Sequence, residues 1–327
     1  MKISSVSLVF SVSVAAILSL STISPGVAAE SAPPTNPAIR AIENSAPGFI
    51  PPANVRRSAD LTTSQARARG GNASNELPTN SGDPVAVQSS SGTVIRFGLP
   101  FNEKAVEGKK QSNGTVVFDN ENGTSTVLVP KEGRSVAAVI VLSSNSSPTR
   151  FNYNLSVPLG GTATLNSRGS VEIFDAKGDF SGVIAPAWAK DSSGKVVATH
   201  YELNGPTLTQ VVDHTSQSYA YPIVADPWLG IDLIDRFSWD GNNIKVHVTP
   251  MMGFVNEAVA AGPGWDELKT KTRNRVNQAT LHQQWVCHAL GKFVIFFEPP
   301  PNNTWDLEGW RRVVTNPVDF ITYRCNW

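Results

Sequence analysis

Reactive side chains gather in one stretch near the C-terminus, Thr280–Phe293, which reads TLHQQWVCHALGKF. It contains His282 and His288, two of the five histidines, and Cys287, one of only two cysteines. A cysteine beside a histidine could act as a nucleophile with its base, and paired histidines could bind a metal ion. Each of these chemistries requires the side chains to converge, so their spacing decides what they can do.

The histidine spacing is unfavourable for a metal site. Metal ligands on a helix lie four residues apart on one face, whereas His282 and His288 are six apart and point about 120° away from each other. His247 could join one of them across a preceding hairpin. We therefore predict no metal and no cofactor. If the domain were a hydrolase, its site candidates would be His247, His282, His288 and Asp266.

Cys287 and Cys325 are the only cysteines. In an exported chain an isolated pair most simply forms a disulfide, and closing this loop contributes roughly 4 kcal/mol in the loop-entropy model. The alternatives are a nucleophilic Cys287, intermolecular pairing or free thiols. Sequence neighbours such as Cys287 and His288 rarely face each other on a helix, so we predict the disulfide.

Seven of the eight tryptophans lie in the last hundred residues. Bulky aromatic side chains fill small cores, and this role accounts for most of them. A minority could line a groove for a glycan or peptide, because exposed aromatic residues are frequent at binding surfaces. We predict Trp305, Trp310 and Arg311 as ligand contacts, since they lie beside the proline-rich loop Glu298–Asn303.

The first 29 residues have the pattern of an export signal. Lys2 precedes the apolar run Val6–Leu20, which serines interrupt, and Val27–Ala29 offers small residues before a cut. The run is short for a membrane span, and no later stretch is long and apolar enough. We predict a signal peptide cleaved near Ala29 and a secreted, extracellular mature protein without a transmembrane span.

The charges balance along the chain. Lys plus Arg number 27 and Asp plus Glu number 27, and the last hundred residues carry ten of each sign. Proteins that bind nucleic acid or anionic membranes normally show a basic excess, so we predict neither partner. The sequence also lacks the G-x-S-x-G, P-loop and dinucleotide-binding patterns.

The elements that would position these residues fall into a linker and two domains. Residues 30–83 are rich in small and polar residues without a sustained period, which predicts a disordered linker. Residues 84–227 contain many short β-branched runs separated by turn residues, which predicts an antiparallel β-sandwich. Residues 228–327 predict a small α+β domain. The predicted fold class is therefore a mostly β N-terminal sandwich domain followed by a small α+β domain, after a long disordered N-terminal segment.

Within the predicted C-terminal domain, alternating residues indicate a hairpin about the turn Asp240–Asn243, with His247 on its polar face. A 3–4 rhythm predicts a helix over Trp265–Leu290, kinked near Asn277 and ended by Gly291. We further predict a strand over Phe293–Phe297, a short helix over Asp306–Val313 and a final strand over Val318–Cys325.

A first resemblance lies in the predicted sandwich, where the chain reads PAWAKDSSGKVVATHYELNG and then YPIVADP. Over Phe151–Pro227 it resembles a β-rich module of secreted proteins from Gram-positive bacteria. In that module YP-hydrophobic-VADP precedes differing C-terminal domains. The resemblance implies a carrier or spacer module rather than an active site.

Five motifs carry a second resemblance: His247–Pro250, Gly264–Leu268, Gln284–His288, Trp305–Arg311 and Arg324–Asn326. Together they resemble a C-terminal domain of unknown function in secreted proteins of high-GC Gram-positive bacteria. Family members tend to end in Cys-Asn-Pro, whereas this chain ends in Cys-Asn-Trp, and its Phe293–Pro301 insertion is longer. The resemblance implies location and architecture, and it supplies no mechanism.

These observations favour a secreted or envelope-associated, non-catalytic protein whose C-terminal domain binds a protein or wall-glycan partner. The main alternative is a secreted hydrolase or antibacterial toxin with its active site in that domain, and a third is a purely structural surface protein with no small-ligand site. The binding and the hydrolase hypotheses differ in whether the histidine and carboxylate side chains lie together in the folded domain. Two histidines that meet a carboxylate in one cleft would favour the enzyme, and separately packed histidines would favour the binding protein.

Overall fold

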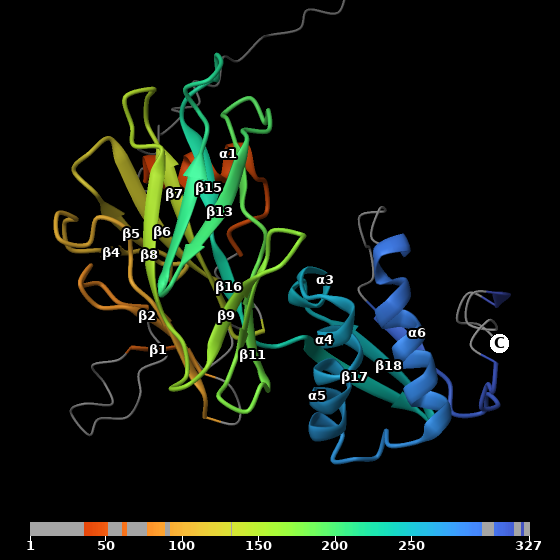
Figure 1. Ribbon diagram of the computed structural model, residues 1–327. Helices are drawn as coiled ribbons and strands as arrows, with labels where there is room; N and C mark the ends of the chain where they lie inside the picture. Colours follow the sequence, from red (N-terminus) through yellow and green to blue (C-terminus); the bar gives the residue numbers. More distant parts are fainter. Residues whose placement is uncertain are drawn as a thin grey trace, which may run out of the picture. The chain divides into compact units, whose positions relative to one another are not determined.

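The computed structural model describes residues 36–51, 61–63, 77–88, 92–131, 133–295, 304–316 and 322–323 (Figure 1). All of them belong to one compact unit, residues 36–327. The described chain is mostly β, with a small region of helices and strands at its C-terminal end, so the predicted fold class is confirmed. None of the described helices combines the length and the apolar character needed to cross a membrane.

Two antiparallel sheets form the larger part. The first contains, in spatial order, β1 (Leu61–Thr63), β2 (Val85–Gln88), β3 (Val94–Phe97), β8 (Arg150–Ser156), β14 (Thr207–Val212) and β13 (Thr199–Asn204). The second contains β4 (Lys109–Lys110), β5 (Val116–Asp119), β6 (Thr124–Lys131), β7 (Ser135–Leu142), β16 (Trp228–Gly230), β11 (Phe180–Ile184), β10 (Val171–Phe174) and β9 (Thr162–Leu165). Beside this row, β12 (Trp188–Lys190) pairs with β15 (Ile223–Asp226), which also pairs with β7.

The sequence of each central strand matches its place in the sheets. All eight residues of β7 are apolar or small and buried, because both faces of the strand are covered. In contrast, β8 alternates exposed and buried residues, and it turns Phe151, Tyr153 and Leu155 towards the core between the sheets. The main core therefore lies between two sheets, as expected for a sandwich.

A helix, α1 (Pro37–Ser45), lies within the predicted linker 30–83 and was not foreseen. The side chain of Asn36 caps it by accepting a hydrogen bond from the Ala38 N–H at 2.9 Å. Ala38, Ile39 and Ile42 are buried against the outer face of the second sheet. A nine-residue helix is marginal alone, so packing on the sheet stabilises it, and a local pattern cannot reveal that contact.

The segment Trp228–Gly230, which we had placed at the start of the C-terminal domain, forms β16 in the second sheet. It pairs with β7 on one side and with β11 on the other. Pro227 had suggested a boundary because proline interrupts strands, but the chain resumes pairing directly after it. The third sheet begins only at Ile234.

The third sheet has the order β17 (Ile234–Asp240), β18 (Asn243–Val248) and β19 (Thr304–Leu307). The hairpin of β17 and β18 was predicted. The helix predicted over Asp306–Val313 is wrong. Trp305 and Asp306 pair with Val246 and Lys245 of β18, and residues 308–313 form turns and irregular structure. Trp305 and Leu307 alternate towards the buried face, and this tertiary contact outweighs the local helical pattern.

Four helices share one buried core with this sheet: α3 (Met251–Phe254), α4 (Glu257–Ala261), α5 (Pro263–Lys271) and α6 (Ala279–Ile295). The single helix predicted over Trp265–Leu290 is divided, because Arg273 and Asn274 adopt left-handed backbone angles with φ of 51° and 62°. In addition, α6 continues through Gly291 to Ile295, so Gly291 does not end it and no strand begins at Phe293. Most of the strand predicted over Val318–Cys325 lies outside the described residues.

Candidate functional site

A row of five aromatic rings joins α5, α6 and β19. Ring centroids are 4.8 Å apart between His282 and Trp265, 6.1 Å between Trp265 and Trp285, 4.6 Å between Trp285 and Trp305, and 5.4 Å between Trp305 and His288. The three tryptophans are at least 94% buried, so they build the core of the C-terminal domain. The partly buried Trp228 and Trp239 also pack against this core, so five of the seven tryptophans in this region contribute to it.

The two histidines of α6 lie at opposite ends of this row, with three indole rings between them. Burial lowers the pKa of His282, and the nearby ammonium group of Lys269 lowers it further. Burial also lowers the pKa of His288, although the backbone and the carboxylate of Asp306 act in the opposite direction. Each imidazole is therefore favoured in its neutral form, and each is packed by a different tryptophan.

The remaining site candidates lie elsewhere. His247 is half-buried on β18, between the buried Val246 and Val248, so it faces the opposite side of the sheet from the tryptophan row. The Asp266 side chain is 68% exposed, and its carboxylate pairs with Lys269 at 2.7 Å. The described residues contain no group of three or more potential metal ligands. The four candidates for a hydrolase site do not come together.

Cys287 lies on α6, is 4% exposed and is not a free thiol. Cys325 lies outside the described residues. The pairing of Cys287 with Cys325 therefore stays a prediction.

Of the three predicted contact residues, the structure exposes mainly one. Trp305 is 6% exposed and belongs to the core, whereas Trp310 is 69% exposed. The guanidinium of Arg311 lies 5.0 Å from the Trp310 ring and forms an ion pair with the carboxylate of Glu308. Trp310 is thus presented at the surface with its neighbouring arginine held in place.

A groove of about 340 Å³ lies at the end of the third sheet. We call it the hairpin groove, and it is lined by Ser238, Trp239, Asp240, Asn243, Ile244, Lys245, Asp306, Leu307 and Glu308. The groove and the turn that carries Trp310 share a residue, Glu308. Except for Asp306, Leu307 and Glu308, the lining residues come from β17 and β18, and none of the nine was predicted as part of a binding site. Because the sequence predicts a helix from Asp306 onwards, it gives no sign that Asp306 lies opposite Lys245.

Three contacts hold the walls of the hairpin groove. The Gly309 N–H donates to the Asn243 side-chain oxygen at 3.1 Å, which fixes the Trp310 turn to the hairpin. The Arg275 guanidinium lies 4.0 Å from the centre of the Trp239 ring, and it also donates to the Gly241 carbonyl at 2.9 Å. A site with walls fixed in this way needs little reordering to bind a ligand.

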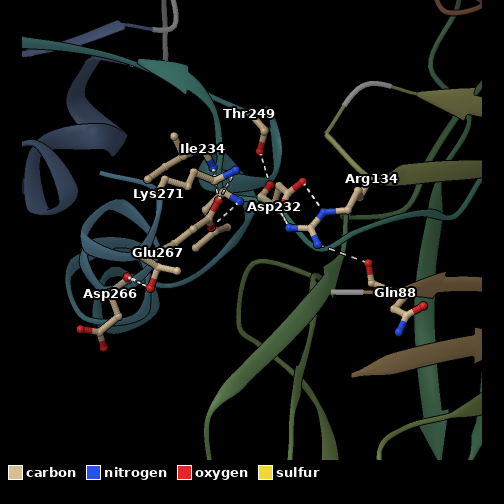
Figure 2. Close-up of polar contacts among 10 residues, drawn as sticks. Gln88, Arg134, Asp232, Ile234, Thr249, Asp266, Glu267 and Lys271 are labelled. Carbon is tan, nitrogen blue, oxygen red and sulfur yellow. Dashed lines mark hydrogen bonds and ion pairs between the residues drawn. The ribbon is translucent and has the colours of Figure 1, made fainter. Parts of the chain in front are cut away.

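A second polar cluster surrounds the segment that leads from β16 into β17 (Figure 2). Arg134, from the turn before β7, donates through Nε to the Asp232 carboxylate at 2.7 Å and forms a second bond through its terminal nitrogen. Both residues are less than 10% exposed. The Thr249 hydroxyl donates to the Asp232 carbonyl at 2.5 Å. The cluster joins the sandwich to the C-terminal region through one buried ion pair.

Glu267 of α5 completes this cluster (Figure 2). Its two carboxylate oxygens accept hydrogen bonds from the successive N–H groups of Leu233 and Ile234, at 2.9 and 3.1 Å. Burial raises the pKa of Glu267 to about 7, and the charge of Asp232 adds to this, whereas Lys271 and the two N–H groups oppose it. The sequence does not reveal this role of Glu267, because the two N–H groups belong to residues more than 30 positions earlier in the chain.

Residues 234–327 match a family model described as a protein of unknown function, DUF2599. The match begins at the first residue of β17 and confirms a C-terminal domain of unknown function. No curated protein and no solved structure matches the chain.

Proposed function

We propose that the chain is an exported, non-catalytic binding protein whose C-terminal domain binds a protein or wall-glycan partner at the hairpin groove. The observation that carries the proposal is Trp310, a tryptophan 69% exposed beside a groove lined with polar side chains. Large exposed aromatic residues next to hydrogen-bonding groups are typical of binding surfaces.

The charges of the groove favour a ligand without strong net charge. Lys245 lies 3.9 Å from Asp306, and both side chains are more than half exposed. Arg275 is stacked on Trp239, a lining residue, and the lining also contains the acidic Glu308. Acidic and basic groups therefore alternate at the surface, which suits a polar chain with both donors and acceptors, such as a glycan or an extended peptide.

The separation of the histidines supports the binding hypothesis over the hydrolase or toxin. A hydrolytic site needs a base, its orienting partner and a reacting group within hydrogen-bond reach of one another. His282 and His288 instead stack on different tryptophans, and His247 lies on the other face of the sheet.

The proposal includes secretion after cleavage near Ala29 and a disulfide between Cys287 and Cys325. Export would place the hairpin groove outside the cell, where protein and glycan partners of the envelope are found. A disulfide would suit that compartment and would tie α6 to the C-terminal segment.

Trp310→Ala in the secreted chain tests the proposed site. We expect it to weaken retention on purified cell-wall glycan or on a captured envelope protein about tenfold or more, as loss of a central aromatic contact does. Leu159→Ala is the matched control, because Leu159 is 99% exposed and lies on the connection from β8 to β9. Equal retention of the wild type and Trp310→Ala would remove the hairpin groove as the site.

A further inference from the structure

A hollow of about 500 Å³ lies in the sandwich, between the connection from β7 to β8 and the connection from β14 to β15. We call it the sandwich hollow, and it is lined by Ser143, Ser144, Asn145, His214, Thr215, Gln217, Ser218, Tyr219 and Tyr221. Its volume falls in the range of about 300–1,000 Å³ that small-molecule sites occupy. It belongs to a different part of the chain from the hairpin groove.

A buried histidine links the two walls of the sandwich hollow. His214 is 1% exposed, and its Nδ1 lies 2.7 Å from the Tyr221 hydroxyl while its Nε2 lies 3.2 Å from the Pro148 carbonyl. The Tyr221 hydroxyl also lies 3.1 Å from the His214 carbonyl, which is an alternative acceptor for its single proton. Since Pro148 and His214 come from opposite walls, this imidazole holds the two connections together.

Further hydrogen bonds fix each wall to the sheets. The Ser143 N–H and the Ser147 hydroxyl both donate to the Gly123 carbonyl, at 3.0 and 2.9 Å. On the other wall, the Ala220 N–H donates to the Asp191 carboxylate at 3.0 Å. These loops are therefore shaped by their own contacts, and a ligand would meet a preformed surface.

The lining of the sandwich hollow is polar. Hydroxyl, amide, phenol and imidazole groups form it, and it contains no carboxylate, ammonium or guanidinium group. The adjacent cation, Lys195, lies 4.5 Å from the Tyr219 ring centre and donates to the Gln217 side-chain oxygen at 3.2 Å. The chemistry does not match an anionic or cationic ligand, because nothing in the lining offers an ion-pair partner.

Several lining groups have hydrogen-bonding capacity to spare. The side chains of Asn145, Thr215 and Ser218 make no hydrogen bond with another described residue. Hydroxyl and amide groups both donate and accept, and the hydroxyls of a sugar do the same. The lining also includes the phenol groups of Tyr219 and Tyr221, and tyrosine is frequent at binding surfaces because it combines an apolar ring with a polar hydroxyl.

We propose that the sandwich hollow is a second binding site, and that it takes an uncharged oligosaccharide. The site is independent of the proposed hairpin groove, because it uses other residues on other elements. The resemblance of this region to a spacer module does not predict any such site.

Titration of the full chain with maltotetraose and with tetra-N-acetylchitotetraose, followed by ligand-observed NMR and calorimetry, tests this proposal. We expect one of these neutral tetrasaccharides to bind. Asn145→Ala should weaken it about threefold to tenfold, as loss of one neutral hydrogen bond does. Thr215→Trp should abolish binding by filling the hollow. Asn154→Ala, an exposed asparagine on β8, should bind as the wild type does.

Two controls make the result decisive. Thermal unfolding of each variant separates a lost site from a lost fold, and Asn145→Ala changes a loop residue without an internal hydrogen bond. Trp310→Ala should leave tetrasaccharide binding unchanged, which separates this site from the hairpin groove.

The proposal is overturned if neither sugar binds the wild type, if Thr215→Trp binds normally, or if only Trp310→Ala abolishes binding. Binding of a random-sequence peptide pool that Thr215→Trp blocks, in place of sugar, would show a peptide site instead.

Discussion

At the scale of single residues, two carboxylic acids have raised pKa values: Asp226, which is buried, and Glu267, which is mostly shielded from water. Burial raises the pKa of Asp226 to about 8, against the opposing influence of the Trp188 side chain and the charge of Lys131. Burial, assisted by the charge of Asp232, raises the pKa of Glu267 to about 7. In both cases the folded chain binds a proton more tightly than the unfolded chain does, so both acids link stability to pH with the same sign.

Glu267→Gln should flatten the pH dependence of stability between pH 5 and 8. The unfolded glutamate loses its proton near pH 4.3, whereas the folded one retains it to about pH 7. The free energy of unfolding of the wild type therefore falls as pH rises through this window and levels off above it. The Glu267 side chain keeps 20% exposure, so we expect a change of only about 2 kcal/mol. Urea unfolding at each pH measures it.

Asp266→Asn is the control for this experiment, because Asp266 is adjacent in sequence but its side chain is 68% exposed. The free energy of unfolding of Asp266→Asn should change with pH as steeply as that of the wild type. A Glu267→Gln chain whose stability falls with pH as steeply as that of the wild type would contradict the assignment of the raised pKa to Glu267.

At the scale of elements, the sequence predicted structure well where local pattern and packing agree. The apolar run of β7 and the Asp240–Asn243 hairpin were predicted, because a continuous or alternating pattern of apolar residues can be recognised in the sequence. The secondary-structure predictions failed where contacts with a segment distant in sequence determine the conformation. β19 is a strand because β18 pairs with it, and α1 is a helix because a sheet covers it.

The candidate sites were less predictable for the same reason. Trp310 was predicted as a contact from its residue type and its neighbours, and it is exposed, whereas Trp305 was assigned to the same surface although it lies in the core. The hairpin groove depends on the pairing of Lys245 with Asp306, and the sandwich hollow on contacts between two distant loops. Such contacts have no periodic signal along the chain.

The predicted disulfide between Cys287 and Cys325 would tie α6 to the C-terminal segment of the chain. We expect the secreted chain, unfolded without reductant, to show no free thiol, and we expect reductant to release two. The Cys287→Ser, Cys325→Ser double variant should lose up to about 4 kcal/mol of stability, since the loop between the cysteines is no longer closed in the unfolded chain. Thiol titration and urea unfolding measure these effects. Two free thiols in the unreduced chain would show that the pairing is wrong.

At the scale of the whole described unit, the region matched by the DUF2599 model does not complete its own core. Val183 of β11 belongs to the same buried cluster as Leu268, Trp285 and Leu307, and Phe174 and Phe180 pack against that cluster. Polar contacts cross at the same junction. Glu172 of β10 accepts hydrogen bonds from the backbone and the side chain of Asn256, at 2.5 and 2.7 Å. The sandwich thus supplies part of the support that the C-terminal helices need.

A single substitution in the sandwich should therefore destabilise the C-terminal region. Arg134→Met removes the partner of Asp232 and leaves a buried carboxylate unpaired, which costs about 3–5 kcal/mol when one member of a buried pair is lost. We expect hydrogen exchange to accelerate at the amides of Leu233 and Ile234, which lie beyond Asp232 in the chain. Arg150→Met removes an exposed ion pair with Glu202 on the sandwich and should have little effect. If Arg134→Met exchanges as slowly as Arg150→Met at these amides, the ion pair does not support the junction, and the C-terminal region must be stabilised from within.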